Sequence, residues 1–316
     1  MENKILYIVV PCYNEEQVLH ETSNRLASLI ERMAAERLVS WESRVMFVDD
    51  GSKDTTWGII EQLHAASPYV TGVKLAGNVG HQNALMAGLF TAKDYADIIV
   101  SIDADLQDDV EVIPQMVREY KNGYDIVYGV RRKRETDSYF KRTTAQGFYK
   151  LMQWLGVRSV YNHADFRLMS QRAVNQLTHF RERNLFLRGM VPLIGYKSTS
   201  VYYDRAERFA GESKYPLGKM VNFALDGITS FSIRPLRMLV YMGLLFILIS
   251  LGILCWVLVR WMTGNVVQGW SSLMLSVWFV GGCILVGLGI MGEYIGKVYI
   301  EVKDRPRYNI ETVLTK

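Results

Sequence analysis

The chain has 316 residues, of which 49% are hydrophobic and 22% are charged, and its net charge is +4. Such an apolar composition excludes intrinsic disorder, and the mild charge gives no indication of nucleic-acid binding. Three scattered cysteines without a CxxC pair exclude a disulfide framework and argue against a cysteine metal site.

The first two thirds of the chain alternate between short apolar runs and helical patterns. The runs predict strands at residues 5–10, 45–48, 73–75, 98–102 and 126–128. The patterns between them predict helices at residues 16–36, 55–66, 82–93 and 111–122. This alternation is typical of an α/β domain with a mostly parallel sheet, in which ligands bind beyond the carboxyl ends of the strands. No GxGxxG follows a predicted strand and GxxxxGK[ST] is absent, so a dinucleotide dehydrogenase and a P-loop ATPase are disfavoured.

Acidic residues gather after two of these predicted strands. Asp49 and Asp50 follow one, and Asp103 and Asp105 follow another. Alternate residues of an extended segment point the same way, so Asp103 and Asp105 share one face. Two carboxylates with an amide oxygen from Gln107 suit Mg²⁺ or Mn²⁺, which take hard oxygen ligands and complete their coordination with water and substrate phosphates.

Two uncharged stretches near the C-terminus are long enough to cross a bilayer. They cover residues 238–259 and 270–292, and a membrane-spanning helix needs about 20 apolar residues. Positive charges flank the pair on its outer ends, while the connection between them carries only Arg260, so the positive-inside rule places both termini in the cytoplasm. The apolar run at residues 5–10 is too short for a signal sequence. Residues 217–231 and 138–155 carry apolar residues at helical spacing and predict amphipathic helices on the membrane surface. The pattern at 217–231 fits a helix packed on the domain core equally well, and its position directly before a membrane span favours the surface.

Five motifs in order resemble those of family 2 glycosyltransferases of the GT-A fold, over nearly the whole chain. They are PCYNE at 11–15, DDGSKD at 49–54, DADLQ at 103–107, NHADFRLM at 162–169 and RFAGESKY at 208–215. The last two are similar to the polyprenyl-phosphate branch, which includes dolichol-phosphate mannose synthase and bacterial bactoprenol glucosyltransferases. The resemblance implies a GT-A domain at residues 1–215, an amphipathic juxtamembrane helix at 216–235, transmembrane helices at 236–262 and 270–292, and a cytoplasmic tail at 293–316.

The resemblance also implies roles for individual residues. The base and ribose of a nucleotide sugar, with UDP favoured, would contact Pro11, Tyr13, Glu15 and Asp50. The metal would be held on the diphosphate by Asp103, Asp105 and Gln107, with Ala104 beside them in the donor site. The phosphates would be bound by Arg131, Arg208 and Lys214. Asp165 is the candidate base, and it can equally orient the sugar or Arg167, or serve as a buried partner of Arg167.

The implied reaction transfers a sugar, with inversion, from the nucleotide sugar to polyprenyl phosphate at the bacterial inner membrane. A homo-oligomer is implied as well, and the tail after Tyr299 is long enough to reach a neighbouring copy. Glucose, N-acetylglucosamine and an aminoarabinose derivative all stay open as the sugar. A processive polysaccharide synthase is disfavoured because the Gln-x-x-Arg-Trp motif is absent. The alternative from another class is an inactive, membrane-tethered nucleotide-sugar sensor or scaffold, but Asp105 and Lys214 are both present.

Overall fold

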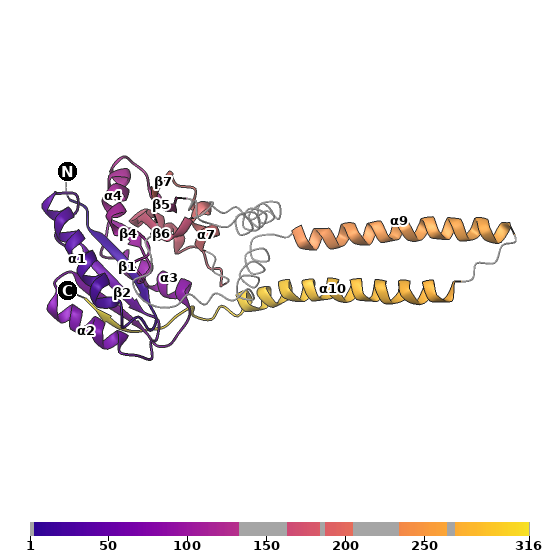
Figure 1. The fold of residues 1–316 in the computed structure, drawn as a ribbon, viewed down its shortest axis with the longest axis horizontal. Coiled ribbons are helices and arrows are strands. Elements are labelled where there is room, and N and C mark those ends of the chain that lie inside the picture. Colours follow the sequence, from indigo (N-terminus) through magenta and orange to yellow (C-terminus); the bar gives the residue numbers. More distant parts are fainter. Residues whose placement is uncertain (1–2, 133–162, 184–186, 205–233, 264–268, 316) are drawn as a thin grey trace. The chain divides into compact units, whose positions relative to one another are not determined.

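The computed structural model describes residues 3–132, 163–183, 187–204, 234–263 and 269–315 (Figure 1). These residues belong to two compact units. The first unit contains the N-terminal domain together with the end of the chain from Arg305, and the second contains the long C-terminal helices.

An eight-stranded mixed sheet forms the centre of the first unit, in the order β7-β5-β6-β4-β1-β2-β3-β8. Its strands are β1 (Leu6–Cys12), β2 (Arg44–Asp49), β3 (Val70–Leu75), β4 (Ile98–Ser101), β5 (Ile126–Arg131), β6 (His163–Ser170), β7 (Ser198–Tyr203) and β8 (Ile310–Leu314). The four strands β4-β1-β2-β3 run parallel, as do β5 and β7, whereas β6 and β8 are antiparallel to their neighbours. The five predicted strands and the mostly parallel sheet are confirmed, and β6, β7 and β8 are additional.

Short helices connect the strands of this unit. They are α1 (Leu19–Ala35), α2 (Thr56–Ala66), α3 (His81–Ala92), α4 (Ile113–Lys121), α6 (Gln171–Leu177) and α7 (Leu187–Met190), with 3₁₀ turns η1 (Val110–Val112) and η2 (Val191–Ile194). The four predicted helices are confirmed, and a 3₁₀ turn forms the beginning of the fourth. Pro114 lies in the first turn of α4, where its missing N–H costs no helical hydrogen bond.

Side chains that alternate along the strands form two core layers. Ile8 and Phe47 are fully buried in a hydrophobic cluster that includes side chains of α1. Their neighbours Val9 and Val48 face α3, which packs so closely that a Cβ on Gly88 would lie 2.4 and 2.6 Å from their methyl carbons. This close packing fixes the N-terminus of α3 at the carboxyl edge of the sheet, where the predicted site residues lie.

The second unit contains α9 (Arg234–Met262) and α10 (Trp270–Val302), which contact each other side by side. The rings of Phe246 and Phe279 meet edge to face with centroids 5.9 Å apart, and Gly287 approaches Leu239. Within the described part of the chain, one stretch, Phe279–Val302, is long and apolar enough to cross a membrane. That stretch ends ten residues beyond the predicted span at 270–292. Membrane crossing by residues 236–262 stays a prediction.

The end of the chain returns to the first unit. Strand β8 pairs antiparallel with β3, and the Asn309 carbonyl accepts a hydrogen bond from the Ala76 amide at 2.9 Å. Arg307 donates to the Phe180 carbonyl oxygen at 2.6 Å. The tail, which we expected to be long enough to reach a neighbouring copy, therefore forms an edge strand of the eight-stranded sheet. The amphipathic helices predicted at 138–155 and 217–231 lie outside the described residues.

Candidate active site

The loops that follow β1 and β2 hold each other in place. Asn14 adopts a left-handed backbone conformation with φ of 54°, and its side-chain oxygen accepts a hydrogen bond from the Lys53 amide at 2.9 Å. The Asn14 amide donates in turn to the Ser52 hydroxyl at 3.0 Å. On either side of Asn14, Tyr13 is 41% exposed and Glu15 is half-buried. Tyr13 is thus free to contact a ligand beyond the strand ends.

Asp50 connects the end of β2 to the beginning of α3. Its two carboxylate oxygens accept hydrogen bonds from the Val79 amide at 2.7 Å and the Gly80 amide at 3.0 Å. Burial raises the pKa of Asp50, and these two hydrogen bonds partly offset that rise. The carboxylate therefore fixes the approach to α3. Its predicted contact with the base, and that of the buried Pro11 in β1, stay predictions.

The acidic segment after β4 makes a tight turn. Leu106 has φ of 54°, and the Asp105 carboxylate accepts a hydrogen bond from the Gln107 amide at 3.2 Å. The Ala104 carbonyl lies 2.9 Å from the Thr22 hydroxyl of α1, which ties the turn to the helix. This turn leaves Asp105 partly exposed at the edge of the sheet, whereas Gln107 is buried.

The Asp103 carboxylate lies near other carboxylates. Burial raises its pKa to about 6; His81 opposes that rise, while Asp165 and Asp108 increase it. A cation beside Asp103 and Asp105 would relieve this repulsion. The described residues form no cluster of three or more His, Cys, Asp or Glu side chains that could hold a metal. Two carboxylates fit an ion that keeps several waters and binds substrate phosphates, as Mg²⁺ does.

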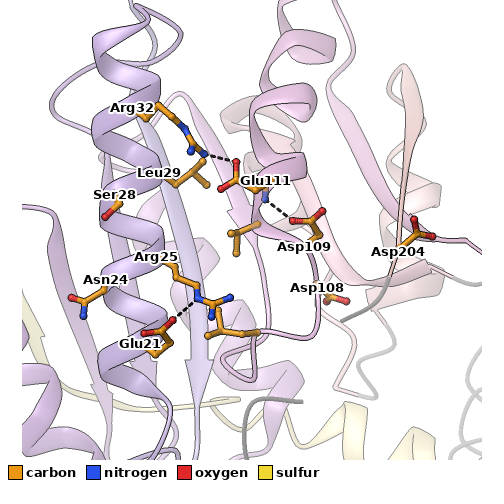
Figure 2. A pocket seen from close by; sticks show the side chains of 12 residues that line it. Glu21, Asn24, Arg25, Ser28, Leu29, Arg32, Asp108, Asp109, Glu111 and Asp204 are labelled. Carbon is orange, nitrogen blue, oxygen red and sulfur yellow. Dashed lines mark hydrogen bonds and ion pairs between the residues drawn. The ribbon is translucent and has the colours of Figure 1, made fainter. Parts of the chain in front are cut away.

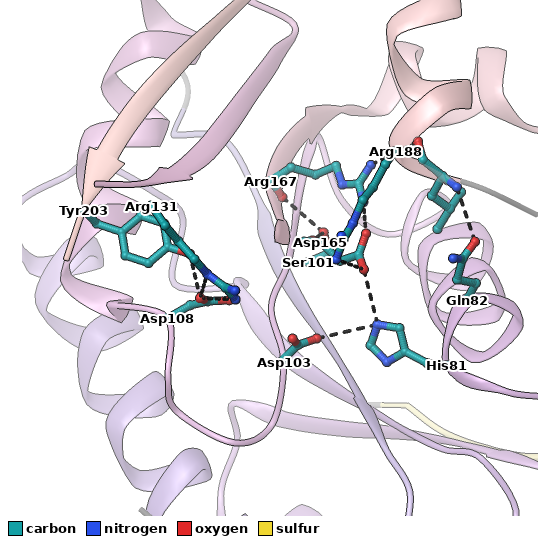
Figure 3. A network of polar contacts seen from close by, with 11 residues as sticks. His81, Gln82, Ser101, Asp103, Asp108, Arg131, Asp165, Arg167, Arg188 and Tyr203 are labelled. Carbon is teal, nitrogen blue, oxygen red and sulfur yellow. Dashed lines mark hydrogen bonds and ion pairs between the residues drawn. The ribbon is translucent and has the colours of Figure 1, made fainter. Parts of the chain in front are cut away.

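Asp165 lies opposite Asp103 in a network of cations (Figure 3). One carboxylate oxygen accepts from a terminal nitrogen of Arg167 at 2.5 Å, and the other lies 3.4 Å from Arg188. The His81 ring nitrogen Nε2 lies 3.5 Å from Asp103 and 3.8 Å from Asp165. Burial alone would raise the pKa of Asp165, but the two guanidinium groups outweigh it and hold this pKa at about 2. So low a pKa makes Asp165 a weak base near neutral pH.

The register of the sheet explains why Asp103 and Asp165 meet. Ser101 of β4 pairs with Arg167 of the antiparallel strand β6. Because the two strands are antiparallel, Asp103, two residues after Ser101, and Asp165, two residues before Arg167, lie at the same end of the strand pair. The Ser101 hydroxyl donates to the Asp165 carbonyl at 2.5 Å and fixes this alignment.

Arg131, at the end of β5, is held by a buried carboxylate. It donates to Asp108 at 2.9 Å through a terminal nitrogen and at 3.2 Å through Nε. The Tyr203 hydroxyl donates to the same Asp108 oxygen at 2.6 Å, and burial raises the pKa of Tyr203. Arg131 therefore has a structural contact beside its predicted contact with phosphate. The other two predicted phosphate ligands, Arg208 and Lys214, lie outside the described residues.

A separate hollow of about 740 Å³ lies between α1 and η1 (Figure 2). Its two arginine side chains already form ion pairs, Arg25 with Glu21 at 2.6 Å and Arg32 with Glu111. Among the described residues that line the hollow, both arginines are thus already paired, and none of the lining residues is one of the predicted site residues.

Sequence reasoning missed His81, Arg188 and the Asp108–Tyr203 pair. A signal existed for two of them, because His81 directly follows the polar segment 78–80 after β3, and Asp108 directly follows Gln107. Arg188 belongs to a helix of four residues, too short to leave a periodic pattern. The burial of Arg167 against Asp165, one of the alternatives for that aspartate, is confirmed.

Comparison with known proteins gives matches along nearly the whole chain. The family model described as "Glycosyl transferase family 2" matches residues 7–178. The uncharacterized glycosyltransferase YkoT of Bacillus subtilis (strain 168) is 52% identical over 97% of this chain and 91% of its own length. The bactoprenol glucosyl transferase of Shigella phage SfII is 41% identical over 96% of each chain. Among solved structures, mannosyl-3-phosphoglycerate synthase from Rubrobacter xylanophilus is similar, with a TM-score of 0.48, 17% identity and 74% of each chain covered.

Proposed function

This chain belongs to glycosyl transferase family 2, and on that premise we propose that it transfers a sugar from a nucleotide sugar to polyprenyl phosphate at a membrane. The observation that carries this proposal is the match with relatives named bactoprenol glucosyl transferase, at 41% identity over 96% of both chains. A match of that length includes the C-terminal helices as well as the sheet domain. The chain is a glycosyltransferase, and bactoprenol is the acceptor class that we infer for it.

The donor would bind across the carboxyl ends of β1, β2 and β4. Tyr13 is exposed there for a contact with the base, beside Pro11, Glu15 and Asp50, and a carboxylate that accepts from a base N–H favours uracil. Asp103, Asp105 and Gln107 would hold Mg²⁺ or Mn²⁺, which when bound neutralises charge on the departing diphosphate. Further charge on the phosphates would be neutralised by Arg131, Arg208 and Lys214.

Asp165 would orient the reacting groups rather than take a proton. Its carboxylate is shared between Arg167 and Arg188, and its pKa of about 2 leaves little affinity for a proton at neutral pH. A polyprenyl phosphate does not need a strong base, because the second pKa of a phosphomonoester is about 6. The ionised oxygen can displace the nucleoside diphosphate directly, with inversion at the anomeric carbon.

The membrane arrangement is part of the same proposal. Apolar side chains of both long helices are widely exposed, for example Leu248 at 66% and Leu285 at 70%, which is typical of a lipid-facing surface. Strand β8 pairs with β3, so the chain after α10 ends on the side of the catalytic sheet. If the chain crossed the membrane once, at Phe279–Val302, β3 and β8 would lie on opposite sides of the membrane and could not pair. We therefore infer a second crossing by α9. The flanking positive charges favour a cytoplasmic location for the catalytic domain and both termini in a bacterium. A homo-oligomer is proposed on the resemblance alone.

A transfer assay tests the function. The purified full-length chain is incubated with undecaprenyl phosphate and, one at a time, radiolabelled UDP-glucose, UDP-N-acetylglucosamine and a UDP-linked aminoarabinose derivative. We expect label from one donor to appear in the lipid fraction. The matched control is Asp105→Asn, which should fold and leave the label in the aqueous phase. Absence of lipid-linked label with every nucleotide sugar would refute the proposal and favour a sensor or scaffold.

A further inference from the structure

Arg188 is a second cation beside the Asp165 carboxylate. Asp165 already has a partner in Arg167, whose side chain is 1% exposed and only 2.5 Å away. Arg188 lies at the longer distance of 3.4 Å from the second carboxylate oxygen, and its side chain is 36% exposed. An ion pair of this length and exposure contributes little to stability.

A second guanidinium at this point also has an electrostatic cost. Burial lowers the pKa of Arg167, Asp165 raises it, and Arg188 lowers it again, because two like charges lie close together. A guanidinium offers five N–H donors in a planar fork. Within the described part of the chain, the contact with Asp165 occupies one face of that fork.

The backbone around Arg188 is anchored while its side chain reaches into the site. The Leu187 amide donates to the Gln82 side chain at 3.3 Å, and the Leu187 carbonyl accepts from Arg167 at 3.4 Å. Leu187 and Gly189 are buried on either side. Figure 3 shows the Arg188 side chain extending from α7 to the Asp165 carboxylate. A cation that is fixed by its neighbours loses little freedom when it binds an anion.

We propose that Arg188 binds a phosphate oxyanion of the substrates. This inference rests on the proposed function. A guanidinium matches phosphate through two parallel N–H···O contacts. The acceptor phosphate is the favoured source, because Figure 3 shows Arg188 approaching the Asp165 carboxylate from the side opposite to Asp103, beside which the diphosphate would bind. In an inverting displacement the nucleophile approaches opposite the leaving group.

The test compares Arg188→Gln and Arg188→Lys with the wild type in the full-length enzyme. The matched control is Arg32→Gln, which removes another partly exposed arginine that pairs with a carboxylate, Glu111, outside the site. Rates are measured against undecaprenyl phosphate and against the nucleotide sugar in turn. We expect Arg188→Gln to raise the acceptor KM at least about tenfold with little change in the donor KM. Arg188→Lys should recover part of the loss, and Arg32→Gln should behave as the wild type.

The two sources of phosphate give different results. If only the donor KM rises, Arg188 still binds a phosphate oxyanion, and that oxyanion belongs to the diphosphate of the donor. Unchanged values of both KM in Arg188→Gln, or a fall in kcat alone with a lower Tm, would overturn the inference. Binding of undecaprenyl phosphate, measured calorimetrically without a donor, separates this inference from the proposed function. Weaker binding in Arg188→Gln together with an inactive wild type would refute only the function, and equal binding would refute the role of Arg188 at the acceptor.

Discussion

Replacing Asp165 by asparagine tests the electrostatic network directly. The pKa of this carboxylate is about 2, compared with an ordinary value of 3.8. The shift is a little under two pKa units, and each unit corresponds to 1.36 kcal/mol. We therefore expect Asp165→Asn to lower the free energy of unfolding by about 2 kcal/mol at pH 7.

The pH dependence of this loss follows from the sign of the shift. A lowered pKa stabilises the fold above the unfolded pKa, and this contribution disappears as the pH falls to the folded pKa. The difference between wild type and Asp165→Asn should therefore be constant above about pH 5 and shrink between about pH 4 and pH 2. Denaturant unfolding followed by fluorescence measures it. The control is Asp94→Asn, because Asp94 is 65% exposed in a surface pair with Lys93 and should change little.

The same variant decides between a proton-accepting and an orienting role. We expect Asp165→Asn to retain more than about a tenth of kcat per folded enzyme, a barrier change below about 1.4 kcal/mol. The acidic limb of the pH–rate profile should persist, because it would report ionisation of the lipid phosphate. A folded variant that loses about a thousandfold in kcat together with that limb would refute this reasoning and make Asp165 the base.

Three further predictions concern the metal, the topology and the packing. Asp105→Asn, and EDTA added to the wild type, should abolish turnover without lowering Tm; full activity in EDTA would remove the metal from the mechanism. A reporter at Asn265 should be extracytoplasmic and one at Lys316 cytoplasmic, and the same side for both would contradict two crossings. Gly88→Ala should destabilise the domain by roughly 1–3 kcal/mol in denaturant unfolding, because its new Cβ would clash with β1 and β2. Gly58→Ala, on an open face of α2, should instead be neutral or stabilising, and equal losses for both would contradict the packing argument.

The sequence predicts those helices and strands whose own residues follow a regular pattern of apolar and polar side chains. Strands β1 to β5 are apolar runs bounded by polar turns, and α1 to α4 repeat at helical spacing, so both can be identified without knowing their partners. Strand β6 carries His163, Asp165 and Arg167 within eight residues. The Asp165 and Arg167 side chains hide the apolar pattern of the strand, because they are stabilised by pairing with each other and, for Asp165, with Arg188 of α7. Strand β8 gains its conformation by pairing with β3, more than 230 residues earlier.

The residues of the candidate site likewise fall into a group that the sequence predicts and a group that it does not. Asp103 and Asp105 could be recognised because both follow one strand, and their proposed role as metal ligands depends on their mutual spacing. Arg188 could not, and the polar segment before His81 indicated its position but not its partners, because both residues acquire a role only when α3 and α7 approach the Asp165 carboxylate. Contacts of this kind depend on helix packing, which no single segment of sequence encodes.

The antiparallel pairing of β4 and β6 links stability to chemistry in this enzyme. Side chains alternate between the two faces of a sheet, so a slip of one residue would move Asp165 to the opposite face and replace it with Phe166. Two features oppose such a slip. Phe166 is fully buried against Gly129, where any Cβ would lie 2.6 Å from its ring, and Ser101 binds the Asp165 carbonyl at 2.5 Å. The packing of an apolar ring on one face of β6 therefore fixes the position of a carboxylate on the other, which explains why core and site residues alternate along this one strand.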